Sequence, residues 1–298
     1  MKLLITGSNG LLGQKIVANC IAQAIDFLAI SSGDNRNPTC PESNYTSIDI
    51  TDFNAVEAFI QANPCTHIIH TAAITNVDAC ELNPVECYKV NHLASQHLFE
   101  ISKEKNIHFT LLSTDFIFDG QQGNYSEIDA PNPLSVYGKS KCLAEQELIN
   151  SAYTNWAIAR TIIVYGVGYH LNKSNIFSWL LKELSEGREV SLITDHFRAP
   201  TWAEDLASGC LAIIRHQQTG IFHLCGPETL SIFEIGLRVA KYLQASPSLI
   251  KPIDSTTLNQ PAPRPPITGF DLSKARMLLG YQPHAIEETL GLLQNNQF

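Results

Sequence analysis

A tyrosine and a lysine four residues apart are the pair in this sequence best suited to chemistry. Tyr137 and Lys141 fall at the start of a predicted helix, and residues at this spacing share one face of a helix. A lysine ammonium beside a phenol favours the phenolate, so we expect Lys141 to lower the pKa of Tyr137 towards a range useful for proton transfer. The pair therefore indicates acid–base chemistry.

A threonine farther upstream supplies a matching hydroxyl. Thr114 and Asp115 end a predicted buried strand that begins at His108. Open parallel sheets bind ligands at the carboxyl ends of their strands, so both residues are predicted to contact a substrate. The Thr114 hydroxyl can hydrogen-bond a substrate oxygen where charge develops. The predicted catalytic residues are Thr114, Tyr137 and Lys141.

A glycine-rich turn near the N-terminus offers a place for a dinucleotide. Gly7, Gly10 and Gly13 follow the first predicted strand at once and open the first predicted helix. Such glycines permit the tight turn, let backbone N–H groups approach phosphates, and let the helix pack against the strand. No Gly-Lys-Ser/Thr sequence follows, which excludes a P-loop. The cofactor contacts predicted here are Gly7, Asn9, Gly10, Leu11, Leu12 and Gly13.

The end of the second predicted strand bears on which dinucleotide is bound. An acidic residue there binds the ribose hydroxyls of NAD(H), whereas a basic residue accommodates the 2′-phosphate of NADP(H). Here Ser31 follows the strand directly, and Arg36 comes soon after Asp34. We therefore favour NADP(H), with Ser31 and Arg36 in contact with it, and keep NAD(H) as the alternative.

The elements that must position these residues alternate between strand and helix. Apolar runs predict strands over 2–6, 26–30, 45–50, 66–70, 108–113 and 156–161, and helical spacing predicts helices over 11–24, 53–62, 84–105 and 134–150, with Asp52 as an N-cap. This alternation predicts an α/β fold with a Rossmann-like, doubly wound parallel sheet.

The second half of the chain has a looser pattern. It predicts helices over 177–186, 202–215, 232–243 and 272–279, and strands over 189–193 and 221–224. We predict a dinucleotide-binding domain over residues 1–163, to which 199–220 return. A smaller C-terminal α/β substrate lobe is predicted from 164–198 and 221–298.

Composition excludes several classes of partner and site. The formal net charge of −9 gives little electrostatic support to nucleic-acid or anionic-membrane binding. The histidines have no metal-binding spacing, and no Gly-x-Ser-x-Gly elbow marks a serine hydrolase, so we expect neither a metal site nor that hydrolase chemistry.

Cysteine usage and the N-terminal residues bear on location. The eight cysteines form no C-x-x-C pair, which favours buried free thiols in a reducing compartment. Met1 and Lys2 run straight into the first strand, and no apolar run approaches the length of a membrane span. We therefore expect a cytoplasmic protein, with a homodimer left open as its assembly.

Together these motifs resemble the extended short-chain dehydrogenase/reductases, and within them the dTDP-4-dehydrorhamnose reductase family. The stretch from Ser113 to Gly120 is the most subfamily-specific match. The other matching stretches are 5–13, 72–78, Glu81, Asn91, 133–141, Arg160, 200–201, 205–207, 264–265 and 271–274. The resemblance implies reduction of the 4-keto group of a nucleotide-linked deoxysugar, from dTDP-4-dehydrorhamnose to dTDP-L-rhamnose.

The resemblance also implies roles for individual residues. Tyr137 would give its proton to the carbonyl oxygen as hydride arrives from the nicotinamide. Asp49 and Ile50 would contact the adenine, and Ala72 and Ala73 would line the cofactor, together with Tyr137 and Lys141. The predicted substrate contacts are Thr114, Asp115, Arg198, Thr201 and Arg264, whose arginines suit a diphosphate.

Two other functions stay open at this point. The regulatory subunit of methionine adenosyltransferase resembles the same family and uses the fold as an NADP-binding module; an intact Thr114, Tyr137 and Lys141 favours an enzyme instead. A sugar-nucleotide epimerase or dehydratase would keep the cofactor but change the outcome. A dehydratase is expected to carry an Asp-Glu pair after the threonine, and here Phe116 follows Asp115.

Overall fold

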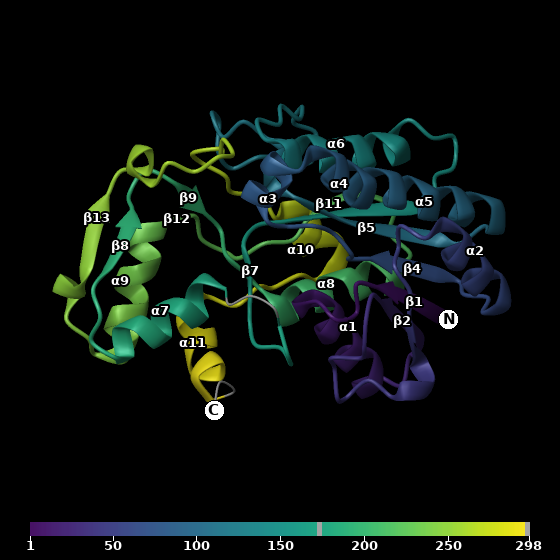
Figure 1. Ribbon diagram of the computed structural model, residues 1–298, viewed down its shortest axis with the longest axis horizontal. Coiled ribbons are helices and arrows are strands. Elements are labelled where there is room, and N and C mark those ends of the chain that lie inside the picture. Colours follow the sequence, from purple (N-terminus) through teal and green to yellow (C-terminus); the bar gives the residue numbers. More distant parts are fainter. Residues whose placement is uncertain (172–174, 296–298) are drawn as a thin grey trace.

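A seven-stranded parallel sheet is the largest element of the computed structural model, which describes residues 1–171 and 175–295 (Figure 1). Each strand pairs in parallel with its neighbours, so the predicted doubly wound sheet is confirmed. The strands are β1 (Lys2–Thr6), β2 (Asp26–Ser31), β3 (Tyr45–Ser47), β4 (His67–His70), β5 (His108–Thr114), β6 (Trp156–Thr161) and β11 (Gly220–His223).

The order of the strands opens a crevice in the middle of the sheet. Across the sheet they run β11-β6-β5-β4-β1-β2-β3. The chain builds outward from β1 to β3, returns to place β4 on the other side of β1, and then builds outward in the opposite direction. At such a switch point the connections leave to opposite faces, and ligands bind between them at the carboxyl ends of the strands. The glycine-rich turn after β1 lies at this point.

Alternation along the strands divides the interior into two cores. Leu3 and Ile5 of β1 pack on one face, whereas Leu4 packs on the other, as the two-residue period of a strand requires. Helices α1 (Leu11–Ala22), α8 (Ala203–Arg215) and α10 (Ser273–Leu279) cover the first face, and α2 (Phe53–Ala62), α5 (Ala94–Lys105) and α6 (Val136–Ile149) cover the second (Figure 1). Burial on both faces explains why the strands are continuous apolar runs in the sequence.

A third apolar cluster lies beside the sheet and forms a smaller α/β unit. Strands β8 (Val190–Ile193) and β13 (Ile250–Ile253) pair in parallel. Helices α7 (Ile176–Ser185), α9 (Ile232–Leu243) and α11 (Ile286–Asn295) pack with them, at the left of Figure 1. Two short strand pairs connect this unit to the sheet: β7 (Val164–Tyr165) with β10 (Thr201–Trp202), and β9 (Phe197–Arg198) with β12 (Leu230–Ser231).

Most predicted elements lie within a few residues of the observed ones. Asp52 caps α2 as predicted, because its carboxylate accepts a hydrogen bond from the Ala55 N–H at 3.1 Å. The helix predicted over 84–105 is interrupted: α4 (Pro84–Tyr88) and α5 are joined by a π-helical turn, η2 (Lys89–Leu93). Helices α3 (Val77–Leu82) and α11 have no counterpart in the prediction. The remaining short turns are η1 (Glu42–Asn44), η3 (Asp115–Ile117), η4 (Pro247–Leu249) and η5 (Ser255–Leu258).

Two segments lie in a different place from the one assigned to them from sequence. Residues 221–223 were assigned to the smaller lobe, yet β11 pairs with β6 at the edge of the main sheet. Helix α10 likewise packs against α8 and β11. That part of the assignment is wrong, because Phe222 and Leu279 are buried in the first core of the sheet. The rest of the predicted division stays a prediction, and its residues 172–174 and 296–298 lie outside the described part of the chain.

No helix among residues 1–171 and 175–295 is both long enough and apolar enough to cross a bilayer.

An ion pair ties helix α6 to the sheet from within. The Arg160 guanidinium donates to both oxygens of Glu145, with a shortest contact of 2.7 Å, and both side chains are only 1% exposed. His223 lies 3.4 Å from the same guanidinium. Burial and, next, the Arg160 charge together lower the pKa of His223 to about 3, so the ring stays neutral. Removing one member of the pair would leave the other as an unpaired buried charge.

We therefore expect Arg160→Met to lower the free energy of unfolding by about 3–5 kcal/mol. The double variant Arg160→Met with Glu145→Met should recover most of that loss, because it leaves no uncompensated charge in the core. Urea unfolding of the two variants beside the wild type measures both values. A double variant that is no more stable than the single one would contradict this account of the pair.

Candidate functional site

A cavity of about 960 Å³ runs along the carboxyl edge of the sheet at the switch point. The glycine-rich turn, the end of β2, the loop after β4, the end of β5 and the start of α6 all line it. Every residue predicted to contact the cofactor lies on its wall: Gly7, Asn9, Gly10, Leu11, Leu12, Gly13, Ser31, Arg36, Asp49, Ile50, Ala72, Ala73, Tyr137 and Lys141.

The glycines of the turn are needed for close approach. Gly7 has a positive φ of 69°, and a Cβ there would lie 2.7 Å from the Ala72 backbone. A Cβ on Gly13 would lie 2.4 Å from the Gly7 carbonyl, so this glycine lets α1 pack against the turn. Gly10 is exposed to the cavity, where a Cβ would take space from a bound phosphate. The turn therefore fits a dinucleotide.

Asn9 joins this turn to the loop that follows β2. Its side-chain amide donates to the Asp34 carbonyl at 2.9 Å and to the Tyr45 hydroxyl at 3.0 Å. Its side-chain oxygen accepts from the Arg36 N–H at 2.9 Å. The Tyr45 hydroxyl in turn donates to the Gly33 carbonyl at 2.5 Å. These bonds fix the course of the loop that brings Arg36 to the wall of the cavity.

The loop after β4 is held by an asparagine from the π-helical turn. Asn91 is fully buried, accepts from the Ile74 N–H at 2.8 Å and donates to the Ile74 carbonyl at 3.0 Å. It thus satisfies the backbone of a loop that has no strand or helix partner of its own. Ala72 and Ala73 keep their place on the cavity wall through this bond pair.

The side chains of Ser135 and Glu81 fix the start of α6. The Ser135 hydroxyl accepts from the Gly138 N–H at 3.1 Å as the N-cap. Glu81, from α3, accepts from the Val136 N–H at 2.9 Å. Gly138 lies so close to the turn after β5 that a Cβ would come within 2.2 Å of the Phe116 carbonyl. The first turn of α6 is therefore locked against the end of β5.

This packing brings the predicted catalytic residues together. Tyr137 and Lys141, 8% and 3% exposed, lie on the cavity wall with Thr114, which ends β5. The Thr114 side chain lies close enough to the Tyr137 phenol to lower its pKa. The Thr114 hydroxyl also donates to Asp115 at 3.0 Å and accepts from the Phe116 N–H at 3.2 Å. A hydroxyl, a phenol and an ammonium thus face one space.

Burial controls the protonation of the tyrosine and the lysine. It raises the pKa of Tyr137 well above the usual value for a phenol, and the nearby Thr114 side chain offsets this only in part. The expected lowering of this pKa by Lys141 is therefore wrong: desolvation dominates, and the charge of Asp115 raises the pKa further. Burial lowers the pKa of Lys141 to about 8, against the opposing effect of Glu145. At neutral pH the tyrosine is a protonated phenol and the lysine an ammonium.

Asp115 and Arg198 form a second buried group behind the threonine. The Arg198 Nε lies 3.6 Å from Asp115 Oδ2, which also accepts from the Thr268 hydroxyl at 2.5 Å. The rest of the guanidinium donates to three backbone carbonyls, those of Phe197, Pro265 and Pro266. Arg198 thereby ties β9 and the proline-rich loop to the end of β5.

The other two predicted substrate contacts differ in position. The Thr201 hydroxyl donates to the Ile162 carbonyl at 2.6 Å, and this fully buried residue lies on neither of the two pockets described here. Arg264 forms an ion pair with Asp78 at 2.8 Å and lines a second pocket. The five predicted substrate residues are thus divided between the cavity, the second pocket and the core.

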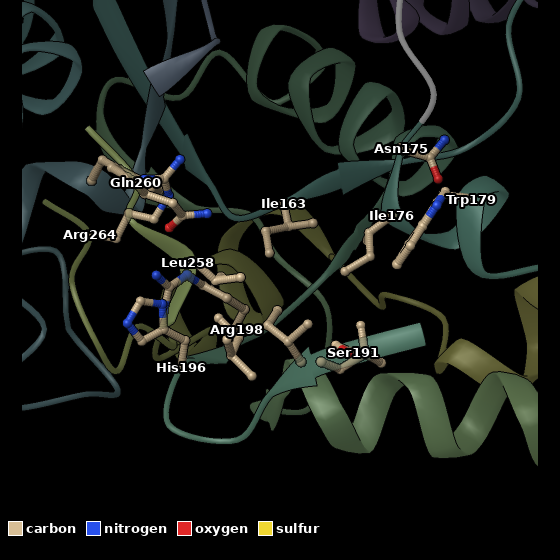
Figure 2. Close-up of a pocket in the computed structure, with 14 residues that line it drawn as sticks. Ile163, Asn175, Ile176, Trp179, Ser191, His196, Arg198, Leu258, Gln260 and Arg264 are labelled. Atoms are coloured by element: carbon tan, nitrogen blue, oxygen red, sulfur yellow. The ribbon is translucent and has the colours of Figure 1, made fainter. Parts of the chain in front are cut away.

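The second pocket, of about 560 Å³, adjoins the first. Both are lined by Phe116, Ile163 and Asn175. Figure 2 shows Arg264, Gln260 and His196 at one end and Ile176 and Trp179 at the other. One end of this pocket is polar, and the other combines the apolar Ile176 and Trp179 with Asn175 and Ser191.

Several residues that shape the site had no predicted role. Tyr45, Glu81 and Asn91 act through hydrogen bonds to backbone atoms of distant segments, a relation that spacing along the chain does not reveal. Glu81 and Asn91 are among the residues that match the family, so the resemblance already marked these two positions. No sequence pattern pointed to the remaining three residues, which lie in the loosely patterned second half of the chain: Trp179, His196 and Gln260.

Comparison with known proteins agrees with this geometry. The profile of the family described as RmlD substrate binding domain matches residues 1–297. The probable low-salt glycan biosynthesis reductase Agl14 of Haloferax volcanii is 30% identical over 99% of this chain and 97% of its own. A dTDP-4-dehydrorhamnose reductase of Mycobacterium tuberculosis is 30% identical over 88% and 82%. Methionine adenosyltransferase 2 subunit beta of Danio rerio is 29% identical over 93% and 84%.

A solved structure extends the likeness to three dimensions. The crystal structure of a hypothetical dTDP-4-dehydrorhamnose reductase from Sulfolobus tokodaii superposes on this chain with a TM-score of 0.84. The two chains are 30% identical, and the superposition covers 96% of this chain and 97% of that one. The match in sequence and fold spans both the sheet and the smaller unit. The chain belongs to the RmlD substrate-binding family, within the extended short-chain dehydrogenase/reductases.

Proposed function

We propose that this protein is an NADP(H)-dependent reductase acting on the 4-keto group of a nucleotide-linked deoxysugar, as in the conversion of dTDP-4-dehydrorhamnose to dTDP-L-rhamnose. One observation carries the proposal: Thr114, Tyr137 and Lys141 meet on the wall of a dinucleotide-sized cavity, next to a second pocket that shares Phe116 and Ile163 with it. The named reductases among the relatives support the same activity.

The chemistry follows from the protonation of the site. NADPH, when bound, supplies the hydride. A phenol whose pKa is raised by burial keeps its proton at neutral pH, which is the form that a ketone reduction consumes. Tyr137 gives this proton to the carbonyl oxygen, and the Thr114 hydroxyl donates a hydrogen bond to the same oxygen. The Lys141 ammonium stabilises the phenolate that Tyr137 becomes.

The substrate would extend from the trio into the second pocket. Its carbonyl carbon must lie beside Tyr137, so the nucleotide falls into the second pocket, which has Ile176 and Trp179 at one end and Arg264 at the other. An aromatic ring and apolar side chains suit a base, and a guanidinium suits a diphosphate. Arg198 and Thr201 are proposed to support the pocket wall instead, since both are buried and bonded to backbone carbonyls. The side chain of Arg264, although paired with Asp78, is 16% exposed.

The two alternatives find less support in the site. A purely regulatory module has no need of three functional groups on a shared cavity wall, although a regulatory subunit is among the relatives. A dehydratase needs an acid and a base next to Thr114, and the position after Asp115 holds Phe116, whose ring meets Tyr137 edge-on at 5.7 Å.

We further propose a cytoplasmic location, where the eight free cysteines stay reduced; a homodimer stays a prediction.

The experiment that tests the proposal mixes the purified protein with NADPH and a panel of 4-keto nucleotide sugars. Loss of absorbance of the reduced nicotinamide with one of them, and a reduced sugar among the products, is the expected result. Binding of NADPH without turnover of any substrate would transfer support to the regulatory function.

For the cofactor, Arg36→Ala should raise the KM for NADPH about tenfold or more, since a hydrogen bond to a charged group contributes about 1.5–3 kcal/mol. The KM for NADH should change little, because NADH lacks the 2′-phosphate. Parallel steady-state kinetics with the two cofactors measure both. Equal effects on the two would show that Arg36 does not read the phosphate.

For the proton donor, Tyr137→Phe should lower kcat by about 10²–10⁴-fold, the usual contribution of a general acid. NADPH affinity, followed by fluorescence titration, should stay close to that of the wild type because the ring itself is kept. Wild-type turnover in this variant would defeat the assignment.

The pH dependence should report Lys141. Its ammonium is present below a pKa of about 8 and lost above it. The kcat/KM for reduction should therefore be high at neutral pH and fall about tenfold per pH unit above about 8. In Lys141→Met this alkaline limb should disappear from a lower and flatter profile. A wild-type profile that stays level far into the alkaline range would contradict the role of the ammonium.

A further inference from the structure

Two cysteines lie directly behind the proposed proton donor. Cys80 is on α3 and Cys87 on α4, two short helices separated by Asn83. Their side chains and that of Tyr137 form one buried cluster, so the two sulfurs and the phenol are neighbours. Each is about 1% exposed. The proposed reaction uses neither thiol.

Cys87 lies among groups that favour its thiolate. The Asn91 amide donates to its sulfur at 3.5 Å. As a thiol, Cys87 donates to the Ser140 hydroxyl at 3.4 Å. The pKa of Cys87 is lowered to about 7, first by the neighbouring Cys80 side chain, and also by the hydrogen bond from Asn91 and the Lys141 charge. By contrast, burial raises the pKa of Cys20 to about 12 and that of Cys65 to about 11. A thiolate is the reactive form of cysteine.

The two sulfurs are also close to the cavity. Tyr137, which belongs to the same buried cluster, lines the cavity. Glu86, next to Cys87, and Val77, one helical turn before Cys80, line it as well. A small oxidant that enters the cavity has only this thin layer to pass. A bound dinucleotide would cover the same wall.

We propose that Cys80 and Cys87 are a reversible oxidation site, which a hydroperoxide converts into a disulfide that disables the reductase. The Cys87 sulfur attacks one peroxide oxygen, the O–O bond breaks, and hydroxide leaves, giving a sulfenic acid. The Cys80 sulfur then attacks the Cys87 sulfur; the S–S bond forms, the S–O bond breaks, and water leaves with the Cys80 proton. The hydroxide takes up the proton that Cys87 lost on ionising, so two electrons from the sulfurs reduce one hydrogen peroxide to two waters.

The bond would act on catalysis through helix α6, and this part of the inference rests on the proposed function. Cys87 contacts Ser140, whose hydroxyl donates to the Tyr137 carbonyl at 2.7 Å. Drawing the Cys87 sulfur towards Cys80 removes this contact and moves the surface on which the Tyr137 ring packs. A phenol displaced from the substrate oxygen cannot deliver its proton.

The sequence between the cysteines gives a direct assay. Glu81 and Glu86 separate them, so a protease that cleaves after glutamate yields two peptides that stay joined only through a disulfide. The wild type is treated with hydrogen peroxide at neutral pH, alkylated, digested and analysed by mass spectrometry; activity is followed before treatment, after it, and after dithiothreitol. Cys65→Ser is the matched control, because Cys65 lies on the same peptide as Cys80.

We expect the Cys80–Cys87 linkage in the wild type and in Cys65→Ser, with an activity loss of about tenfold or more that dithiothreitol reverses. Saturating NADPH should slow its formation. In Cys80→Ser the linkage should be absent, and dithiothreitol should restore less of the activity lost.

Three outcomes would overturn the inference: no linkage in the wild type, linkage without loss of activity, or reversible loss of the same size in Cys80→Ser. Linkage is measured without any substrate, and the untreated activity tests the proposed function on its own. The failure of one is therefore distinguishable from the failure of the other.

Discussion

Water is nearly excluded from Tyr137 and Lys141, and the rest of the site depends on that exclusion. In water a phenol and an ammonium would both hold their protons to about pH 10. Burial separates them: it strengthens the hold of Tyr137 on its proton and weakens that of Lys141. As a result, Tyr137 stays a neutral, protonated phenol until a substrate oxygen takes its proton. The Lys141 ammonium beside it is still present at neutral pH.

That exclusion is produced by packing far from the reacting atoms. Helix α6 starts where Ser135 and Glu81 cap it, approaches β5 because Gly138 has no side chain, and is joined to β6 by the buried Glu145–Arg160 pair. Cys80 and Cys87 form the surface behind the phenol. A change at any of these contacts alters how far the proton donor is desolvated, which is why thiol chemistry there would reach catalysis.

The sequence predicted the parts of this arrangement that depend on local pattern. Strand and helix alternation, the turn from Gly7 to Gly13 and the spacing of Tyr137 and Lys141 are visible without a structure, and the observed elements agree. It could not predict relations set by tertiary contacts. Arg198 donates to the carbonyl of Pro265, and Thr201 to that of Ile162, both distant in sequence. Strand β11 joins the main sheet because Phe222 packs in the same core as Leu3. The direction of the Tyr137 pKa shift was wrong for the same reason: a one-dimensional spacing shows the neighbouring charge but not the burial.

Transfer of a labelled hydride tests the central claim most directly. With NADPH carrying deuterium at the transferable position of nicotinamide C4, the account predicts one deuterium on carbon 4 of the sugar product, oxidised cofactor in equal amount, and no solvent hydrogen at that carbon. Deuterium that returns to the cofactor with no net oxidation, or a label taken from solvent at carbon 4, would contradict reduction by this site.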